Sequence, residues 1–119
     1  MTTQQKIGFI GLGIMGAPMA THLADAGHTL FVNTIGPVPQ SLEGRATVCA
    51  NGTEVAQKAD ITFIMVPDTP DVEKVLFGEG GVAAGLSKGK IVVDCSSIDP
   101  IATKGFAKRI IALGCGYID

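Results

Sequence analysis

The sequence contains no tryptophan, and charged residues make up only 17% of its 119 residues. Nine Lys and Arg residues face eleven Asp and Glu residues, which gives a formal net charge of -2. Nucleic-acid surfaces need clustered positive charge, so this balance argues against a nucleic-acid partner. No run of about 18 apolar residues occurs, so we expect no membrane span. The N-terminal residues 1–5 form no apolar signal segment, and we therefore expect a cytoplasmic protein.

Cysteine is scarce and histidine scarcer. Cys49, Cys95 and Cys115 are odd in number and show no C-x-x-C spacing, so we expect neither a disulfide framework nor a metal site. We expect the thiols to be small buried groups. His22 and His28 have no Cys or carboxylate at ligand spacing, and we expect them to lie on the surface or at a helix end.

The remaining residues alternate between apolar strand-like runs and amphipathic segments. Each run is closed by glycine or proline, and 119 residues suffice for one core. We expect strands at 6–10, 29–32, 46–49, 61–66, 91–94 and from 117, and helices at 13–26, 53–58, 71–77 and 100–113. Short helical turns are expected near 40–42 and within 78–89. The last helix is expected to bury Phe106, Ile110 and Leu113. The seven lysines are expected to be solvated surface charges.

Alternation of strands and helices favours an α/β fold with a parallel, doubly wound sheet. Right-handed crossovers then predict six strands in the order 3-2-1-4-5-6, with helices on both faces. Ligands of such sheets bind beyond the carboxyl ends of the strands, where the strand order reverses. Three segments are expected to converge there: the residues after the first strand, 66–68 and 94–96.

The segment after the first strand is Gly11-Leu12-Gly13-Ile14-Met15-Gly16. In a Rossmann-type fold, Gly11 permits the tight turn, Gly13 lets backbone approach a pyrophosphate, and Gly16 lets the helix pack closely on the strand. Amide groups at the helix start then face the anion. G-x-G-x-x-G alone is weak evidence, but a strand before it and a helix after it favour dinucleotide binding.

The residue at the end of the second strand bears on the choice of cofactor. An Asp or Glu there is typical of NAD-binding sequences, whereas this chain has Asn33. An amide can bond a ribose hydroxyl but does not repel the extra phosphate of NADP. No Arg follows at position 34, and Arg45 is the nearest along the chain. We expect NAD(P)H, with a slight preference for NADH.

Several segments together resemble the N-terminal domain of the beta-hydroxyacid dehydrogenases. The resemblance spans nearly the whole chain and is carried by 8–16, 34–38, 63–70, 75–79 and 94–100. Thr34-Ile35-Gly36-Pro37 favours the branch that reduces tartronate semialdehyde to D-glycerate over 3-hydroxyisobutyrate dehydrogenases. A free-standing dinucleotide-binding module without chemistry is the other alternative.

The resemblance implies roles for particular residues. Residues 11–16 would hold the pyrophosphate, and Asn33 and Thr34 would lie beside the adenosine ribose. Met65, Val66 and Pro67 would line the cofactor. Ser96 would lie near the nicotinamide; the alternative for Ser96 and Ser97 is helix capping, which is favoured for Ser97 but not for Ser96.

The family's catalytic Lys and substrate loop have no match here, so we assign no catalytic residue. The abrupt stop at the sixth strand favours a fragment: residues 1–119 would form the cofactor-binding domain and lack the helical substrate and dimerisation domain. The full-length enzyme would then be a homo-oligomer acting on a small hydroxy acid or semialdehyde, and the fragment alone would be inactive.

Overall fold

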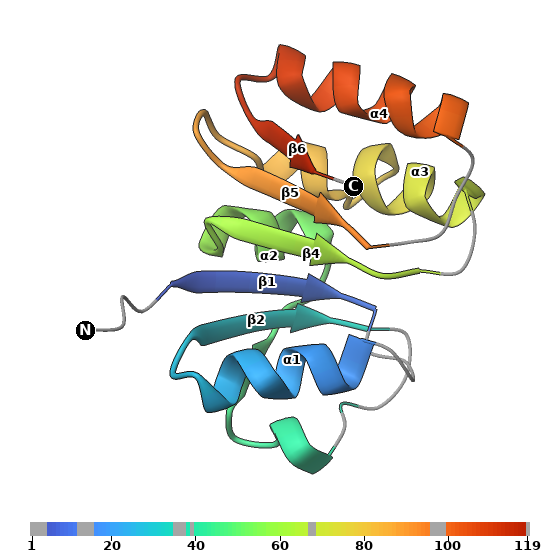
Figure 1. The fold of residues 1–119 in the computed structure, drawn as a ribbon. Helices are drawn as coiled ribbons and strands as arrows, with labels where there is room; N and C mark the ends of the chain where they lie inside the picture. The colour runs from blue at the N-terminus through green and yellow to red at the C-terminus, as the bar shows by residue number, and fades with distance from the viewer. Residues whose placement is uncertain are drawn as a thin grey trace.

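The computed structural model describes residues 5–11, 16–34, 38, 40–66, 69–95 and 100–118. Its centre is a six-stranded sheet in the order β3-β2-β1-β4-β5-β6, in which every pair of neighbours is parallel. The labelled strand arrows in Figure 1 therefore point to the same side. The predicted fold class and strand order are confirmed. The strands are β1 (Lys6–Ile10), β2 (Thr29–Asn33), β3 (Ala46–Val48), β4 (Ile61–Ile64), β5 (Ile91–Asp94) and β6 (Gly116–Ile118).

The helices follow the expected positions with small shifts at their ends. They are α1 (Gly16–Asp25), α2 (Gly52–Lys58), α3 (Thr69–Phe77) and α4 (Pro100–Ala112), with 3-10 turns η1 (Gln40–Leu42) and η2 (Val82–Gly85). β4 ends before the expected Val66, although the Met65 amide still donates to the Ile10 carbonyl at 2.9 Å. α3 starts before the expected Asp71 because Pro70 is compatible with a first helical turn.

Side chains alternate between the two faces of the sheet, and each face has its own core. Ile7 and Phe9 of β1 pack with Leu30, Val32, Ala20 of α1 and Leu42 of η1. Ile10 points the other way, into a larger core built from α2, α3, η2 and α4. Figure 1 shows α1 on one side of the sheet and α2 and α3 on the other. Helices on both faces are thus confirmed.

Coverage of the two faces is unequal. On the α1 face, the described helices cover the β1 and β2 half of the sheet. Ile61, Ile91 and Val93 lie on this face of β4 and β5 and are only half-buried. Ile118 on β6 is 55% exposed. Within the described residues, this half of the face carries apolar side chains without a covering layer.

The short helix α2 is held at both ends. Asn51 Oδ1 accepts the Glu54 amide at 2.9 Å, and Glu54 Oε1 accepts the Ala50 amide at 3.0 Å. Asn51 is therefore the N-cap of α2. At the other end, Lys90 Nζ donates to the carbonyls of Ala56 and Gln57 at 2.5 and 2.8 Å. The prediction that Lys90 is merely a solvated charge is wrong, because it caps a helix C-terminus.

The last helix corrects a second prediction. Phe106 and Ile110 are buried as expected, but Leu113 is 48% exposed. α4 ends at Ala112, and Gly114 turns the chain at a φ of +84°. Helical spacing no longer applies to Leu113, and the buried Cys115 lies in the core instead.

Candidate functional site

Five predicted site residues lie at the carboxyl edge of the sheet. β1 and β4 are neighbours although they are far apart in sequence, and this is the point where the strand order reverses. The Gly11 amide donates to the Asn33 carbonyl at 3.1 Å, which joins the ends of β1 and β2. Met65 and Val66 continue from β4 beside them. Thr34 follows Asn33 and is half-buried.

Gly11 and Gly16 form a cradle with no room for side chains. Gly11 has a φ of +92°, and a Cβ built on it would lie 2.0 Å from the Met65 carbonyl oxygen. A Cβ on Gly16 would lie 2.1 Å from the Gly11 carbonyl oxygen and 3.2 Å from the Phe9 ring. Both distances are far below van der Waals contact, so glycine is required at both positions. This close approach fits the roles that the motif assigns to its first and third glycines.

The Gly11 amide itself is engaged with Asn33, so an anion here would need the later amides of the loop. Leu12, Gly13, Ile14 and Met15 lie outside the described residues. Their expected contacts with the cofactor stay predictions.

Asn33 is oriented by a neighbouring strand. Its Nδ2 donates to the Cys49 carbonyl at 3.0 Å, just past the end of β3. Because the amide group has one donor and one acceptor side, this bond fixes which side faces Cys49. Its Oδ1 is then the side that can accept a hydrogen bond from a ribose hydroxyl.

A pocket of about 440 Å³ opens beside Asn33. Its apolar lining comes from Ile10, Val66 and Val75, and its charged lining from Asp71, Lys74 and Glu79. This volume lies in the range of small-molecule sites. Sequence reasoning found Asn33 and Val66 here but missed the side contributed by α3 and by the turns around it. The remaining lining residues are Ala50, Asn51, Gly52, Gly80 and Gly81.

The spacing of the α3 residues was the available signal. Asp71, Lys74 and Val75 stand at i, i+3 and i+4, so they share one helix face. The opposing residues Val72 and Leu76 are buried in the core. Charged residues next to a core stripe are ordinarily solvent-facing, which is why the pattern alone did not indicate a pocket.

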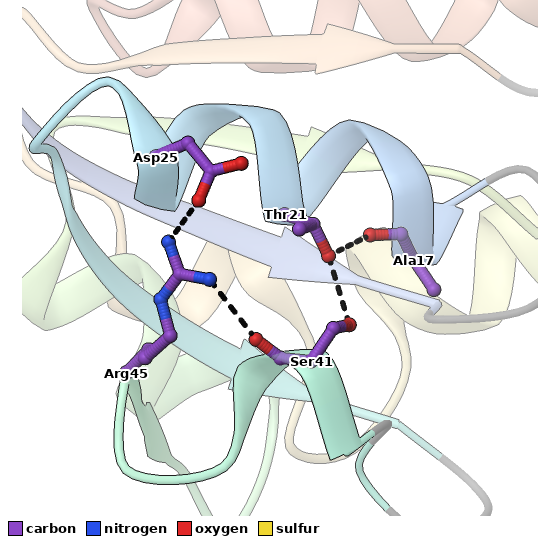
Figure 2. A network of polar contacts seen from close by, with 5 residues as sticks. All are labelled: Ala17, Thr21, Asp25, Ser41 and Arg45. Carbon is purple, nitrogen blue, oxygen red and sulfur yellow. Dashed lines mark hydrogen bonds and ion pairs between the residues drawn. The ribbon is translucent and has the colours of Figure 1, made fainter.

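Arg45, the nearest cation after Asn33 in sequence, points elsewhere. Figure 2 shows its guanidinium between α1 and η1, where it forms an ion pair with Asp25 and donates to the Ser41 carbonyl at 3.2 Å. The hydroxyl oxygen of Ser41 lies 3.0 Å from the hydroxyl oxygen of Thr21, within hydrogen-bond distance. Arg45 does not line the pocket beside Asn33.

At the end of β5, Asp94 is buried, with 3% of its surface exposed. Tyr117 of β6 donates its hydroxyl to Asp94 Oδ2 at 2.5 Å. The next residue, Cys95, is half-buried. The pKa of its thiol is raised mainly by burial and to a smaller extent by the nearby Asp94 carboxylate. Ser96 and Pro67 lie outside the described residues, and their expected roles stay predictions.

The cysteines match the expectation in part. Cys49 and Cys115 are buried, Cys95 is half-buried, and all three are free thiols. Burial, and next the Glu54 side chain, raises the pKa of Cys49. Among the residues that the structure describes, no three His, Cys, Asp or Glu side chains are grouped as metal ligands would be. None of the helices in that part of the chain is long and apolar enough to span a bilayer.

A second hollow of about 410 Å³ lies between α3 and α4 and contains none of the predicted site residues. Arg109 covers part of it, with its guanidinium carbon 3.6 Å from the centre of the Phe77 ring. This cation-π contact fixes the arginine against α3. The pocket at Asn33 is therefore the candidate site, because residues at the ends of β1 and β2 and just after β4 line it.

Comparison with known proteins agrees with this geometry. A family model described as the NAD binding domain of 6-phosphogluconate dehydrogenase matches residues 6–119. The chain is 56% identical over 115 residues to 2-hydroxy-3-oxopropionate reductase of Escherichia coli, covering 96% of this chain and 39% of the relative. It is 34% identical over 121 residues to mitochondrial 3-hydroxyisobutyrate dehydrogenase of Mus musculus, covering 100% of this chain and 36% of that protein.

A solved structure of Psf3 in complex with NADP+ and 2-OPP has the same fold, with a TM-score of 0.83 and 24% identity. The match covers 95% of this chain and 41% of that one. The chain thus spans about two fifths of the length of these relatives. By its glycine cradle, its strand order and the family match over 6–119, the chain belongs to the NAD-binding domain family of the beta-hydroxyacid dehydrogenases, a family of oxidoreductases.

Proposed function

We propose that this chain is the cofactor-binding domain of an NAD(P)H-dependent reductase that converts tartronate semialdehyde (2-hydroxy-3-oxopropionate) to D-glycerate. The cradle at Gly11 and Gly16 is the observation that carries cofactor binding, because these two glycines allow the tight turn after β1 and the close packing of the α1 start on which a pyrophosphate-binding loop depends. The 56% identity to a 2-hydroxy-3-oxopropionate reductase supports the substrate.

In this proposal each strand end contacts one part of the dinucleotide. Residues 11–16 bind the pyrophosphate, and Asn33 and Thr34 bind the adenosine ribose. Met65, Val66 and Pro67 line the cofactor along the end of β4, and Ser96 lies near the nicotinamide. The bound dihydronicotinamide supplies a hydride to the carbonyl carbon of the substrate. The task of these residues is to bind and orient the cofactor.

We further propose that the proton donor is a Lys in a second, helical domain that also forms the dimer. The curated relatives are longer than this chain, since it covers 36–39% of them, which leaves room for such a domain. No lysine of this chain matches the family's catalytic motif. Without a proton donor beside the substrate carbonyl, the alkoxide that forms during hydride transfer is not stabilised. Residues 1–119 alone should therefore bind cofactor without turnover.

NADH is the proposed preferred cofactor. Asn33 presents an uncharged amide, and Arg45 is engaged by Asp25 away from the pocket. A solved structure of the same fold is in complex with NADP+, so the fold alone does not imply NADH. The preference therefore depends on the residues that line this particular pocket.

Titration of the chain with NADH and with NADPH, followed by nicotinamide fluorescence and thermal shift, tests cofactor binding. NADH at about 100 times its dissociation constant should stabilise the fold by about 2.7 kcal/mol. Replacing Gly13 with Val should abolish the fluorescence change, because the side chain would block the pyrophosphate. No response to either dinucleotide at millimolar concentration would refute the proposed site.

Two alternatives remain distinguishable. The mouse relative supports a 3-hydroxyisobutyrate dehydrogenase, and assays of the full-length protein with tartronate semialdehyde and with 3-hydroxyisobutyrate would separate the two substrates. A non-catalytic dinucleotide-binding module would bind NADH, yet the complete gene product would neither reduce tartronate semialdehyde with NAD(P)H nor oxidise 3-hydroxyisobutyrate with NAD(P)+. Turnover of tartronate semialdehyde by the full-length protein would exclude that module.

A further inference from the structure

The pocket beside Asn33 carries its charge on one side. Asp71 and Lys74 project from α3, and Glu79 follows in the turn after this helix. The charged lining therefore consists of two carboxylates and one ammonium group, all contributed by α3 and the turn after it. In the part of the chain that the structure describes, no ion pair ties up these three groups. The net charge of this lining is negative by one.

The opposite side of the pocket is neutral. Asn33 supplies an amide whose Nδ2 is bound to the Cys49 carbonyl, and Asn51 caps α2 through its Oδ1. Arg45 is held by Asp25 and by the Ser41 carbonyl outside the pocket. The end of β2 therefore offers neither a carboxylate to repel a phosphate nor an arginine to bind one.

From this distribution we propose that Asp71 and Glu79 select NADH over NADPH by repelling the 2′-phosphate across the pocket. The inference rests on the proposed function, since it requires the adenosine ribose at Asn33. A ribose diol is uncharged and can donate hydrogen bonds, whereas a 2′-phosphate adds nearly two negative charges. Lys74 opposes this repulsion with a single charge and does not cancel both carboxylates.

Both acidic side chains are exposed, so their effect has the properties of a screened interaction. Raising the salt concentration should narrow the difference between the NADH and NADPH affinities, because the Debye length shortens. Selection by direct hydrogen bonds to a buried group would be far less sensitive to salt. The salt series thus reports on the mechanism as well as on the preference.

Charge variants on one helix and the turn after it provide the test. Glu79→Lys and Asp71→Asn should each tighten NADPH binding, by about tenfold for the charge reversal, and leave the NADH affinity within about twofold. Lys74→Gln should weaken NADPH binding more than NADH binding. Glu73→Lys is the matched control, since Glu73 lies on α3 but lines the hollow toward α4 instead. It should alter neither affinity.

The outcomes separate the inference from the proposed function. If the wild-type chain binds NADH, but Glu79→Lys and Asp71→Asn keep the wild-type ratio of NADH to NADPH affinity, the inference is overturned and the proposed function stands. Tighter wild-type binding of NADPH than of NADH would also overturn it. Failure of the wild-type chain to bind either dinucleotide would overturn the proposed function and the inference with it. Thermal unfolding of each variant confirms that the comparison is made between folded proteins.

Discussion

Two glycines set the geometry of the site at the scale of single residues. Gly11 and Gly16 are glycines because the β1 turn, the end of β4 and the start of α1 pass within contact distance of one another. Gly105 in the middle of α4 is different, since a Cβ there would meet nothing within 4 Å. The same amino acid is thus obligatory at one helical position and replaceable at another.

We expect opposite effects of Gly→Ala at these helical positions. Gly16→Ala should lower the free energy of unfolding by about 1–3 kcal/mol, because its Cβ would overlap the Gly11 carbonyl. Gly105→Ala should raise it by about 0.5–1 kcal/mol through helix propensity. Urea unfolding of the two variants measures both changes. Equal stability of the two would show that α1 can move away from β1 without cost.

The cysteines supply a pH prediction. The pKa values of the Cys49 and Cys95 thiols are both raised, mainly by burial, above the ordinary value of 9.0. The thiolate is the nucleophile, so both should react slowly with iodoacetamide at neutral pH and faster as pH rises toward 9 and beyond. A raised pKa in the folded state also means that stability is fully present below pH 9.0 and is lost as pH climbs through the folded values.

Mass spectrometry of alkylated peptides would measure each thiol separately, and the urea-unfolded chain serves as the control. Native rates that equal the unfolded rates at pH 7 would contradict the assigned burial.

At the scale of elements, α2 is stabilised by residues outside it. The helix has only seven residues, which is too short to be stable by propensity alone. Asn51 caps its start, and Lys90, which immediately precedes β5, caps its end. The Lys90 contact thereby links α2 to β5, which lies two positions from β1 in the sheet.

Replacing Lys90 with Met should lower the free energy of unfolding by about 1–2 kcal/mol, because the Ala56 and Gln57 carbonyls lose their donor. Lys88→Met is the control, since Lys88 is exposed and carries the same side chain. Chemical denaturation of the pair measures the difference. Matching values for the two variants would mean that water replaces the ammonium group fully.

The elements were largely predictable because their signals are local. Local signals include glycines that follow helices, at Gly27 and Gly114, and Pro67 after the apolar run of β4. These signals, like the helical spacing in α3, each lie within a short window of sequence. Leu113 was wrongly expected in the core because the helical period was extended past the end of α4. The capping role of Lys90 and the α3 side of the pocket depend on contacts between distant segments, which no local pattern encodes.

At the scale of the whole molecule, the sheet is covered unevenly. The larger core joins α2, α3 and α4 on one face, whereas the α1 face is covered only over β1 and β2 by described helices. The expected homo-oligomeric state and cytoplasmic location stay predictions. The half-exposed apolar residues nonetheless determine how the chain should behave when studied by itself.

We expect the chain to self-associate in a concentration-dependent way through the uncovered half of the α1 face. Sedimentation velocity over a series of concentrations should show a rising weight-average mass. Val93→Thr and Ile118→Thr should reduce the association, because both change apolar groups on this face. Ile101→Thr is the control, since Ile101 is 80% exposed but lies on α4 at the opposite face. A constant monomer mass at all concentrations would contradict the expectation.

The strand order also has a kinetic consequence during biosynthesis. β1 precedes β4 in the chain, and its register with β4 pairs Ile7 with Ile61, so the central ladder cannot close until the residues through β4 have been made. Non-local parallel pairing is intrinsically slow. Until then β1 has one open edge, and an unpaired edge of an apolar strand is prone to non-native pairing.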